Sequence, residues 1–390
     1  MKNESIIYFA KEWNQDRTSC DHVFDQLARH NKVLWVNSMA MRTPKLSGAS
    51  DWRRIFAKLR RSIGGLKQVG PTAWVYQPIV IPLPHSKLAQ WLNRHLLRWS
   101  LRRQTRKLGF QHPQLWTFLP NVAFMVGQLD ESLVVYYCID AWSEFSYIDG
   151  KKITAMERDL AEKADLCFAT AHSLAEHLRR YNPNCHVALH GVDYGHFVRA
   201  LDPAIAGPED VAHLPRPIIG FFGLIHNWID LPLIAAIARK HPEWSVVLIG
   251  KADVDLALLK DLPNVHLLGR RPYETLPSYC KAFNVGIIPF VLNELTRNVN
   301  PIKLREYLSA GLPVVSTALP EVLAYPDHVS VGSTPEEFIA QIERAIREDN
   351  PVARRQRSCA MQHETWEEKV SQFCTLVTAA KARKSQTVAQ

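Results

Sequence analysis

The sequence lacks any apolar run long enough to cross a membrane. A spanning helix needs roughly 20 consecutive apolar residues, and no segment of the 390-residue chain approaches that length. The first ten residues, Met1 to Ala10, are too short and too polar for a signal peptide, and they predict a first strand instead. We therefore expect a cytoplasmic protein that can be no more than peripheral on the inner face of the plasma membrane.

Cysteine is also scarce, and its pattern excludes several classes of site. The seven cysteines are odd in number and contain no C-x-x-C pair, which argues against a disulfide framework and against a zinc site. No cluster of residues in the sequence has the spacing of metal ligands. We expect reduced thiols, no bound metal and no cofactor.

Acidic residues are nearly absent from one segment. Between Met41 and Phe110 there are 15 Lys and Arg residues against a single acid, Asp51. Subtraction from the totals of 47 and 38 leaves 32 basic and 37 acidic residues elsewhere, a net charge of −5. The whole basic excess of this +9 chain therefore lies in that segment.

Two parts of the basic segment, 51–66 and 88–108, carry apolar residues and tryptophan at helical spacing among arginines. Basic amphipathic helices with tryptophan suit an anionic bilayer surface, where each cation contributes about 1 kcal/mol. Alternatively, the second helix packs on a sheet and carries only a solvated outer face. Nucleic acid is not an expected partner, because no recognition motif accompanies the charge.

The length and the pattern of apolar segments predict two α/β domains. Short apolar strands alternate with helical segments, as in parallel sheets. The proline-rich stretch 198–217 is interpreted as an interdomain linker. The expected domains are 1–200, 201–355 and a C-terminal helix in 356–390, within a helical tail from Arg354 to Ala380. The expected strands are Ser5–Ala10, Val33–Asn37, Trp74–Val80, Leu115–Phe118, Leu133–Ile139, Leu166–Ala169, His186–Leu189, Ile218–Phe222, Ser245–Ile249, Val265–Leu268, Val285–Pro289 and Pro313–Ser316.

The most informative segment is 298–316, with the sequence NVNPIKLREYLSAGLPVVS. Pro301 suits a first helical turn, and Gly311 suits the left-handed backbone that follows a helix. Lys303 and Glu306 are three residues apart and share one helical face. A cation beside a helix N-terminus suits phosphate, and a nearby carboxylate suits the hydroxyls of a ribose. The segment therefore predicts a nucleotide site.

The same segment resembles the donor-binding motif of GT-B glycosyltransferases of the family-4 type. The resemblance implies an α/β fold of two Rossmann-like domains facing across a cleft, with a C-terminal helix crossing back to the first domain. It also implies that Glu306 holds the ribose of a sugar nucleotide. The stretch from His190 to Phe197 resembles a signature that closes the first domain in that family.

The sequence departs from the family pattern at two places. Asn298 stands eight residues before Glu306, where the family has a glutamate that touches the donor sugar. The residues after Gly223 lack the usual Arg and Lys for the diphosphate, so Lys303 is expected to bind it, with Arg297 as the second choice. The xanthan-type glucuronosyltransferases, a similar group, imply the same use of a lysine. Gly223 could equally be a plain strand-to-helix turn.

Other candidates follow the ends of strands. Arg271 and Tyr273 lie on a loop that resembles the nucleobase-binding loop; the alternative is that they are surface residues without a binding role. Asp140 follows an apolar strand and matches the catalytic base of the glucuronosyltransferases, although it could instead cap a helix. His172 and His190 are expected on the acceptor side. The remaining expected donor residues are Gly223, Asn298, Asn300, Lys303 and Glu306.

The resemblance and the charge together imply a function. We expect a metal-independent glycosyltransferase that moves a sugar from a nucleotide sugar, in particular a UDP-sugar, to a saccharide or polyprenyl-linked acceptor in cell-surface or exopolysaccharide synthesis. The alternatives are a sugar-nucleotide epimerase of the same fold and a non-catalytic nucleotide-sugar binding protein.

Overall fold

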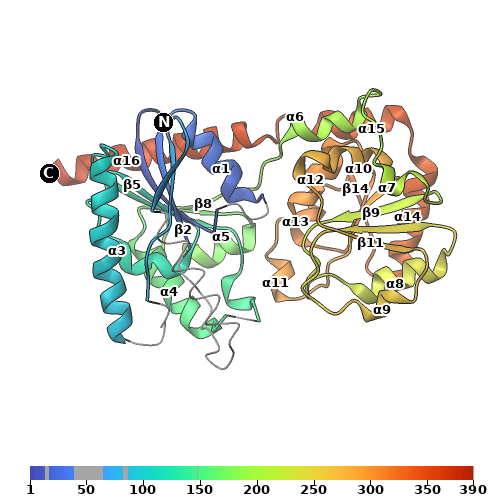
Figure 1. Cartoon of the computed structure of the whole chain (residues 1–390), viewed down its shortest axis with the longest axis horizontal. Helices are drawn as coiled ribbons and strands as arrows, with labels where there is room; N and C mark the ends of the chain where they lie inside the picture. Colours follow the sequence, from blue (N-terminus) through green and yellow to red (C-terminus); the bar gives the residue numbers. More distant parts are fainter. Residues whose placement is uncertain (14–16, 39–64, 82–86, 147, 390) are drawn as a thin grey trace. The chain divides into compact units, whose positions relative to one another are not determined.

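The computed structural model describes residues 1–13, 17–38, 65–81, 87–146 and 148–389 (Figure 1). The chain divides into two compact units, of which unit 1 holds residues 1–189 and 370–390 and unit 2 holds residues 190–369. The predicted amphipathic segment 51–66 lies almost wholly outside the described residues. Among the described helices, none combines the length and the apolar composition that a membrane crossing needs.

Unit 1 is built on an eight-stranded sheet with the order β3-β4-β2-β1-β5-β6-β7-β8. Its strands are parallel except that β3 runs antiparallel to β4. The strands are β1 (Ser5–Ala10), β2 (Lys32–Asn37), β3 (Leu66–Gly70), β4 (Ala73–Tyr76), β5 (Gln114–Thr117), β6 (Leu133–Cys138), β7 (Leu166–Ala169) and β8 (Cys185–Val187). The helices are α1 (Ser19–Ala28), α3 (Lys87–Lys107), η1 (Pro120–Met125), η2 (Trp142–Glu144), α4 (Gly150–Lys163) and α5 (His172–Arg179).

Unit 2 is built on a six-stranded parallel sheet with the order β11-β10-β9-β12-β13-β14. The strands are β9 (Ile218–Phe222), β10 (Ser245–Ile249), β11 (Val265–Gly269), β12 (Val285–Ile288), β13 (Val314–Ser316) and β14 (Val329–Val331). The helices are α6 (Tyr194–Phe197), η3 (Val198–Leu201), α7 (Glu209–Ala212), α8 (Leu231–Lys240), α9 (Ala257–Lys260), η4 (Tyr273–Thr275), α10 (Leu276–Ala282), α11 (Glu294–Arg297), α12 (Ile302–Ser309), α13 (Pro320–Leu323), α14 (Pro335–Glu348), α15 (Pro351–Ala360) and the start of α16 (Trp366–Ala389).

The two sheets confirm the predicted parallel α/β architecture, and two elements correct its details. Strand β4 ends at Tyr76 rather than Val80, because Pro78 has no N–H to continue a ladder. The predicted helical tail from Arg354 to Ala380 is interrupted: α15 ends at Ala360 and α16 begins at Trp366. Between them, Thr365 pairs with Val192 in an isolated parallel bridge, which takes its backbone out of a helix.

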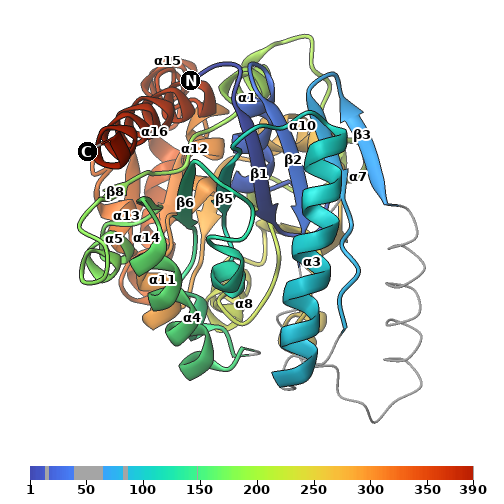
Figure 2. The same ribbon diagram turned by 90° about the vertical axis from the view of Figure 1, so that its left-hand side faces the viewer.

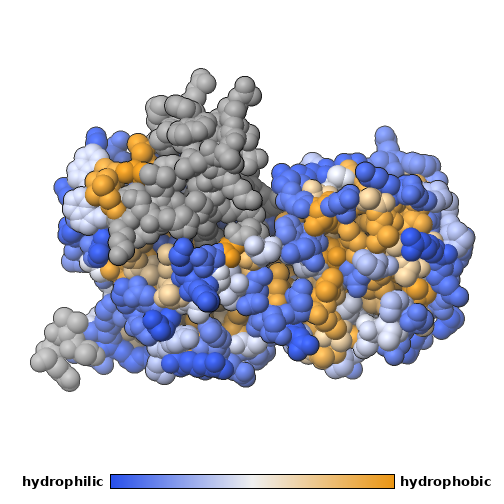
Figure 3. Space-filling view, turned by 90° about the horizontal axis from the view of Figure 1, so that it is seen from below, coloured by the Kyte–Doolittle hydropathy of each residue, from blue (hydrophilic) through white to orange (hydrophobic). Residues whose placement is uncertain are grey.

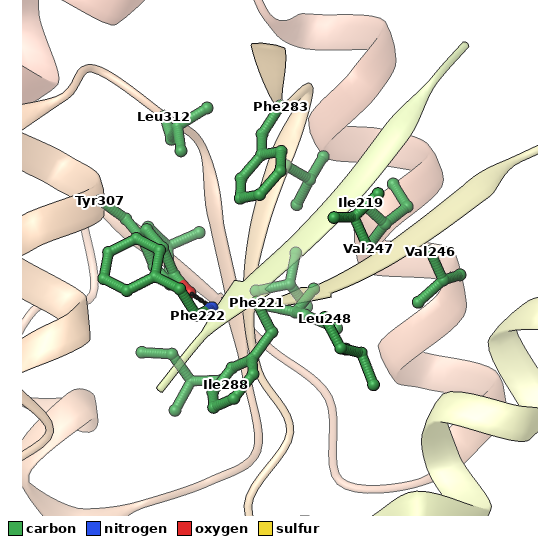
Figure 4. Close-up of a cluster of buried hydrophobic side chains, with 14 of the residues drawn as sticks. Ile219, Phe221, Phe222, Val246, Val247, Leu248, Phe283, Ile288, Tyr307 and Leu312 are labelled. Atoms are coloured by element: carbon green, nitrogen blue, oxygen red, sulfur yellow. Dashed lines mark hydrogen bonds between the residues drawn. The ribbon is translucent and has the colours of Figure 1, made fainter. Parts of the chain in front are cut away.

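The core of unit 2 lies around β9 and β10, whose residues are fully buried (Figure 4). Strands covered on both faces are apolar throughout rather than alternating. The backbone N–H of Phe222 donates to the hydroxyl oxygen of Tyr307 on α12 at 3.0 Å, drawn as a dashed line in Figure 4. This hydrogen bond satisfies a polar group inside an apolar cluster and fixes α12 against the end of β9.

The strand order of unit 2 defines where that unit is expected to bind ligands. In unit 2, β9 has β10 on one side and β12 on the other, so the chain connections run in opposite directions from it. In open α/β sheets, ligands bind outside the carboxyl ends of the strands at such a switch point. Gly223 is the first residue after β9, and α12 is fixed beside it through Tyr307.

The C-terminal helix returns to unit 1, as the resemblance implied. From Val370 onward, α16 belongs to unit 1 (Figure 1). Phe373 packs against Tyr137 and Phe168 at ring-centroid distances of 5.5 and 5.1 Å. Lys381 forms an ion pair with Glu4 at 2.7 Å. The helix is therefore attached to unit 1 by packing and by charge.

Candidate functional site

The candidate site in unit 2 begins with helix α12. Pro301 is the N-cap of α12, and the first helical residue is Ile302. The helix therefore begins one residue later than predicted, since Pro301 was expected in its first turn. Gly311 has φ +78°, and a Cβ there would lie 2.8 Å from the Leu201 side chain. Only glycine adopts that backbone readily and leaves that space. The predicted helix and its glycine stop are therefore present.

Lys303 and Glu306 form an ion pair on this helix. The Lys303 Nζ atom lies 3.1 Å from Glu306 Oε2 and 5.2 Å from the centroid of the Phe222 ring. Glu306 is only 4% exposed, and its buried Oε2 has no hydrogen bond of good geometry among the described residues. A buried carboxylate oxygen left in that state favours a ligand that donates a hydrogen bond.

Two glycines make room for this pair at the strand ends. Gly223 has φ +149°, and a Cβ there would lie 3.2 Å from Lys303 Cε. Gly250, directly after β10, has φ +147°, and its Cβ would lie 1.8 Å from the Gly223 carbonyl oxygen. The backbone of Gly250 therefore packs directly on the backbone of Gly223, and the Lys303 side chain packs against Gly223. Sequence reasoning missed Gly250, because the requirement for glycine there comes from Gly223, the residue that follows the neighbouring strand β9.

A buried arginine, also missed from the sequence, holds the first part of the motif. Arg305 is 0% exposed. It donates to Asn300 Oδ1 at 2.7 Å, to the Tyr325 hydroxyl at 2.7 Å and to Glu364 at 3.1 Å. These bonds satisfy the guanidinium and fix Asn300 just before α12. Asn300, which was predicted to bind the donor, is thereby engaged within the protein.

The other predicted donor residues are also engaged in local contacts. Asn298 caps the end of α11 and donates to the Glu294 carbonyl at 2.6 Å. Arg271 donates to Asp210 at 2.8 Å, and the two form an ion pair. Tyr273 stacks on His196 with the ring centroids 4.4 Å apart. Their roles toward a nucleotide stay predictions.

His190 was predicted on the acceptor side, and it lies in unit 2. Its side chain is buried, its ring packs against Trp366, and its Nδ1 atom has no hydrogen-bond partner among the described residues. Burial, together with the positive charges of Arg305 and Lys303, lowers the pKa of His190 to about 3. The imidazole is therefore neutral near neutral pH.

In unit 1, Asp140 follows β6 by two residues and is half-buried. Burial raises the pKa of this carboxyl to about 7. The alternative that Asp140 caps a helix is not supported, because Ala141 is the N-cap of η2 and that cap has no side-chain hydrogen bond. A carboxyl that titrates near neutral pH suits general base catalysis.

His172 is the exposed first residue of α5 and stands three residues after the last residue of β7, Ala169. The structure thus brings Gly223, Lys303 and Glu306 together in unit 2. It places Asp140 and His172 at strand ends in unit 1. Among the described residues, no group of His, Cys, Asp and Glu is arranged to hold a metal ion.

The architecture is that of GT-B glycosyltransferases. Sucrose-phosphate synthase from Thermosynechococcus elongatus superposes with a TM-score of 0.69 at 15% identity, covering 98% of this chain and 100% of that one. Anabaena Alr3699/HepE, solved in complex with UDP and glucose, has a TM-score of 0.62 at 14% identity, with 100% of both chains covered. At these identities the comparison establishes the fold alone.

Sequence comparison adds the family. Residues 216–348 match the family described as Glycosyl transferases group 1, so unit 2 carries a domain of that family. The chain is also 27% identical over 256 residues to a Bacillus subtilis (strain 168) protein named as the teichuronic acid biosynthesis glycosyltransferase TuaH. That match covers 60% of this chain and 63% of the relative's length.

Proposed function

We propose that this protein is a glycosyltransferase that moves a sugar from a UDP-sugar to a saccharide acceptor. The observation that carries the proposal is the Lys303–Glu306 pair on α12, packed against Gly223 at the switch point of the unit 2 sheet. The group 1 domain match over residues 216–348 supports it. The nucleotide sugar is the substrate, and the proposal includes no cofactor.

In the proposed donor complex, the ion pair is exchanged for ligand contacts. The Lys303 ammonium binds the diphosphate, together with the N-terminal dipole of α12. Glu306, released from the lysine, accepts hydrogen bonds from the ribose hydroxyls. These two ligand contacts replace the Lys303–Glu306 ion pair. Because the Glu306 carboxylate is already buried in that pair, binding the ribose requires little further desolvation of it.

Asp140 is the proposed general base. The acceptor hydroxyl oxygen attacks the anomeric carbon, the bond from that carbon to the diphosphate breaks, and the hydroxyl proton passes to Asp140. Lys303 stabilises the negative charge that develops on the leaving diphosphate. A single displacement of this kind inverts the anomeric configuration.

The choice of UDP and of the acceptor class comes from the relatives. A structural neighbour was solved in complex with UDP and glucose, and another structure of the same protein in complex with UDP-glucose. A sequence relative is named for teichuronic acid biosynthesis. We propose a polyprenyl-linked saccharide acceptor and a role in cell-surface polysaccharide synthesis, with the protein peripheral on the cytoplasmic membrane face.

A donor screen by thermal shift tests the proposal. Binding adds RT ln(1 + [L]/Kd) to stability, so UDP and UDP-sugars should raise the Tm, while ADP-, GDP- and CDP-sugars at the same concentration should raise it less. Incubation of the best donor without acceptor separates transfer from epimerisation. Equal shifts with all four nucleotides, or conversion of the donor to an epimer, would refute the assignment.

A further inference from the structure

Helix α3 exposes an unusual amount of apolar surface. Leu88, Trp91, Leu96 and Trp99 are 67%, 57%, 43% and 63% exposed, and we call these four residues the aromatic face of α3. Exposed large apolar side chains are ordinary when they are scattered singly, but a contiguous group marks an interaction site. Figure 2 shows α3 lying along the side of unit 1 that faces the viewer.

The core side of α3 is distinct from this face. Leu97 and Leu101 are fully buried, and they hold the helix against unit 1. At 100° per residue, Leu88 and Trp99 point to the side opposite Leu97. When α3 packs on its own sheet, the aromatic face therefore points outward. A helix with only a solvated, charged outer face, the alternative considered from the sequence, would not expose these apolar side chains.

The charge on α3 is of one sign. The helix contains no Asp or Glu, and Arg94, Arg103 and Arg106 are exposed. The Arg103 guanidinium lies 5.7 Å from the centroid of the Trp99 ring. The aromatic face occupies the first part of the helix, and the cluster from Arg102 to Lys107 occupies its end. Arg102 differs from its neighbours because it is bound to Asp130 at 3.0 Å.

We infer that the aromatic face of α3 and its three exposed arginines seat the protein on an anionic lipid bilayer. Tryptophan and leucine enter the boundary between headgroups and acyl chains, while the arginines contact lipid phosphates. A nucleic acid would use the arginines but not the exposed leucines. In Figure 3, apolar residues reach the surface among hydrophilic ones at the left-hand edge, on unit 1.

The inference rests on the proposed function only for the biological reason for membrane binding, because a membrane-linked acceptor explains why the enzyme would bind a bilayer. Vesicle binding needs no sugar substrate. Binding to vesicles without a Tm shift from UDP would support this inference and overturn the proposed donor. A Tm shift from UDP without binding to vesicles would support the proposed donor and overturn this inference.

Co-flotation of the full chain with phosphatidylglycerol-containing vesicles, compared with pure phosphatidylcholine vesicles, tests the inference. We expect Trp91→Ser/Trp99→Ser to weaken binding at both low and high salt. We expect Arg94→Gln/Arg103→Gln/Arg106→Gln to weaken it about a hundredfold at low salt, at about fivefold for each cation removed, and to abolish the preference for the anionic lipid.

The matched controls lie on unit 2, where Leu258 and Leu292 are each 43% exposed and Arg239 and Lys240 are exposed. Leu258→Ser/Leu292→Ser and Arg239→Gln/Lys240→Gln should bind vesicles as the wild type does. Loss of binding in these controls, or unchanged binding in both α3 variants, would overturn the inference. So would tighter binding to duplex DNA than to vesicles, or a wild-type dimer that Trp91→Ser/Trp99→Ser converts to monomer.

Discussion

At the scale of single residues, the carboxyl of Asp140 is set for proton transfer near neutral pH. Its pKa is raised by burial to about 7, so it is protonated below that pH and cannot accept the acceptor's proton. We expect kcat/KM to rise tenfold per pH unit below pH 7 and to level off above it. Asp140→Asn should lose about 10²- to 10⁴-fold in kcat.

A stability measurement on the same variant provides the control. The folded-state pKa of Asp140 lies above its unfolded value, so the stability that this half-buried carboxyl contributes when protonated is lost as pH rises from the unfolded pKa through about 7. Asp140→Asn should therefore gain Tm relative to wild type at pH 8 and not at pH 4. A flat activity profile from pH 5.5 to 8 would contradict the assigned role.

Arg305 supports the site through its hydrogen bonds rather than through a substrate. Arg305→Met removes the donor to Asn300, Tyr325 and Glu364 and should cost about 3 kcal/mol of unfolding free energy, the scale for a broken buried pair. Glu364 keeps Lys369 as a partner at 3.1 Å, which limits the loss. Arg239→Met, on the exposed end of α8, is the matched control and should change stability little.

At the scale of elements, the close approach of two strand ends depends on Gly250. Gly250→Ala would place a Cβ against the Gly223 carbonyl and should destabilise unit 2 by about 2 kcal/mol or more. UDP binding should weaken as well, because Lys303 packs on Gly223. Urea unfolding and calorimetry would measure the two effects.

Gly195→Ala in α6 is the control for this change. A Cβ at Gly195 would meet nothing within 4 Å, so the substitution should leave stability within about 1 kcal/mol of wild type. If Gly250→Ala behaved like Gly195→Ala, the described backbone contact would be wrong.

The elements also show what the sequence could and could not predict. Helix α12 was predictable because Pro301 and Gly311 act locally on the backbone. The burial of Arg305 was not, since its partners Asn300, Tyr325 and Glu364 come from three places in the chain. The need for glycine at position 250 was not predictable for the same reason, because the backbone it packs against is that of Gly223, which follows another strand. Asp140 was predicted from its place after an apolar strand, while its environment needed the fold.

At the scale of the whole molecule, the chain returns to unit 1 through α16. Phe373 is 3% exposed and packs on Tyr137 and Phe168. Phe373→Ala should destabilise unit 1 by about 3–5 kcal/mol, the usual cost of truncating a buried phenylalanine. UDP affinity should stay unchanged, because Phe373 belongs to unit 1 and the proposed donor residues to unit 2. A loss of UDP affinity equal to the loss of stability would contradict that separation.

The donor site on α12 is tested most directly by the affinity of the protein for UDP compared with 2′,3′-dideoxy-UDP. By titration calorimetry, the wild type should prefer UDP about tenfold or more, the value of a hydrogen bond to a charged group. Lys303→Ala should weaken both ligands by the same factor, and Glu306→Ala should bind the two equally. A preference for UDP that persists in Glu306→Ala would contradict the assignment of the ribose to Glu306 and, with it, the donor site on α12.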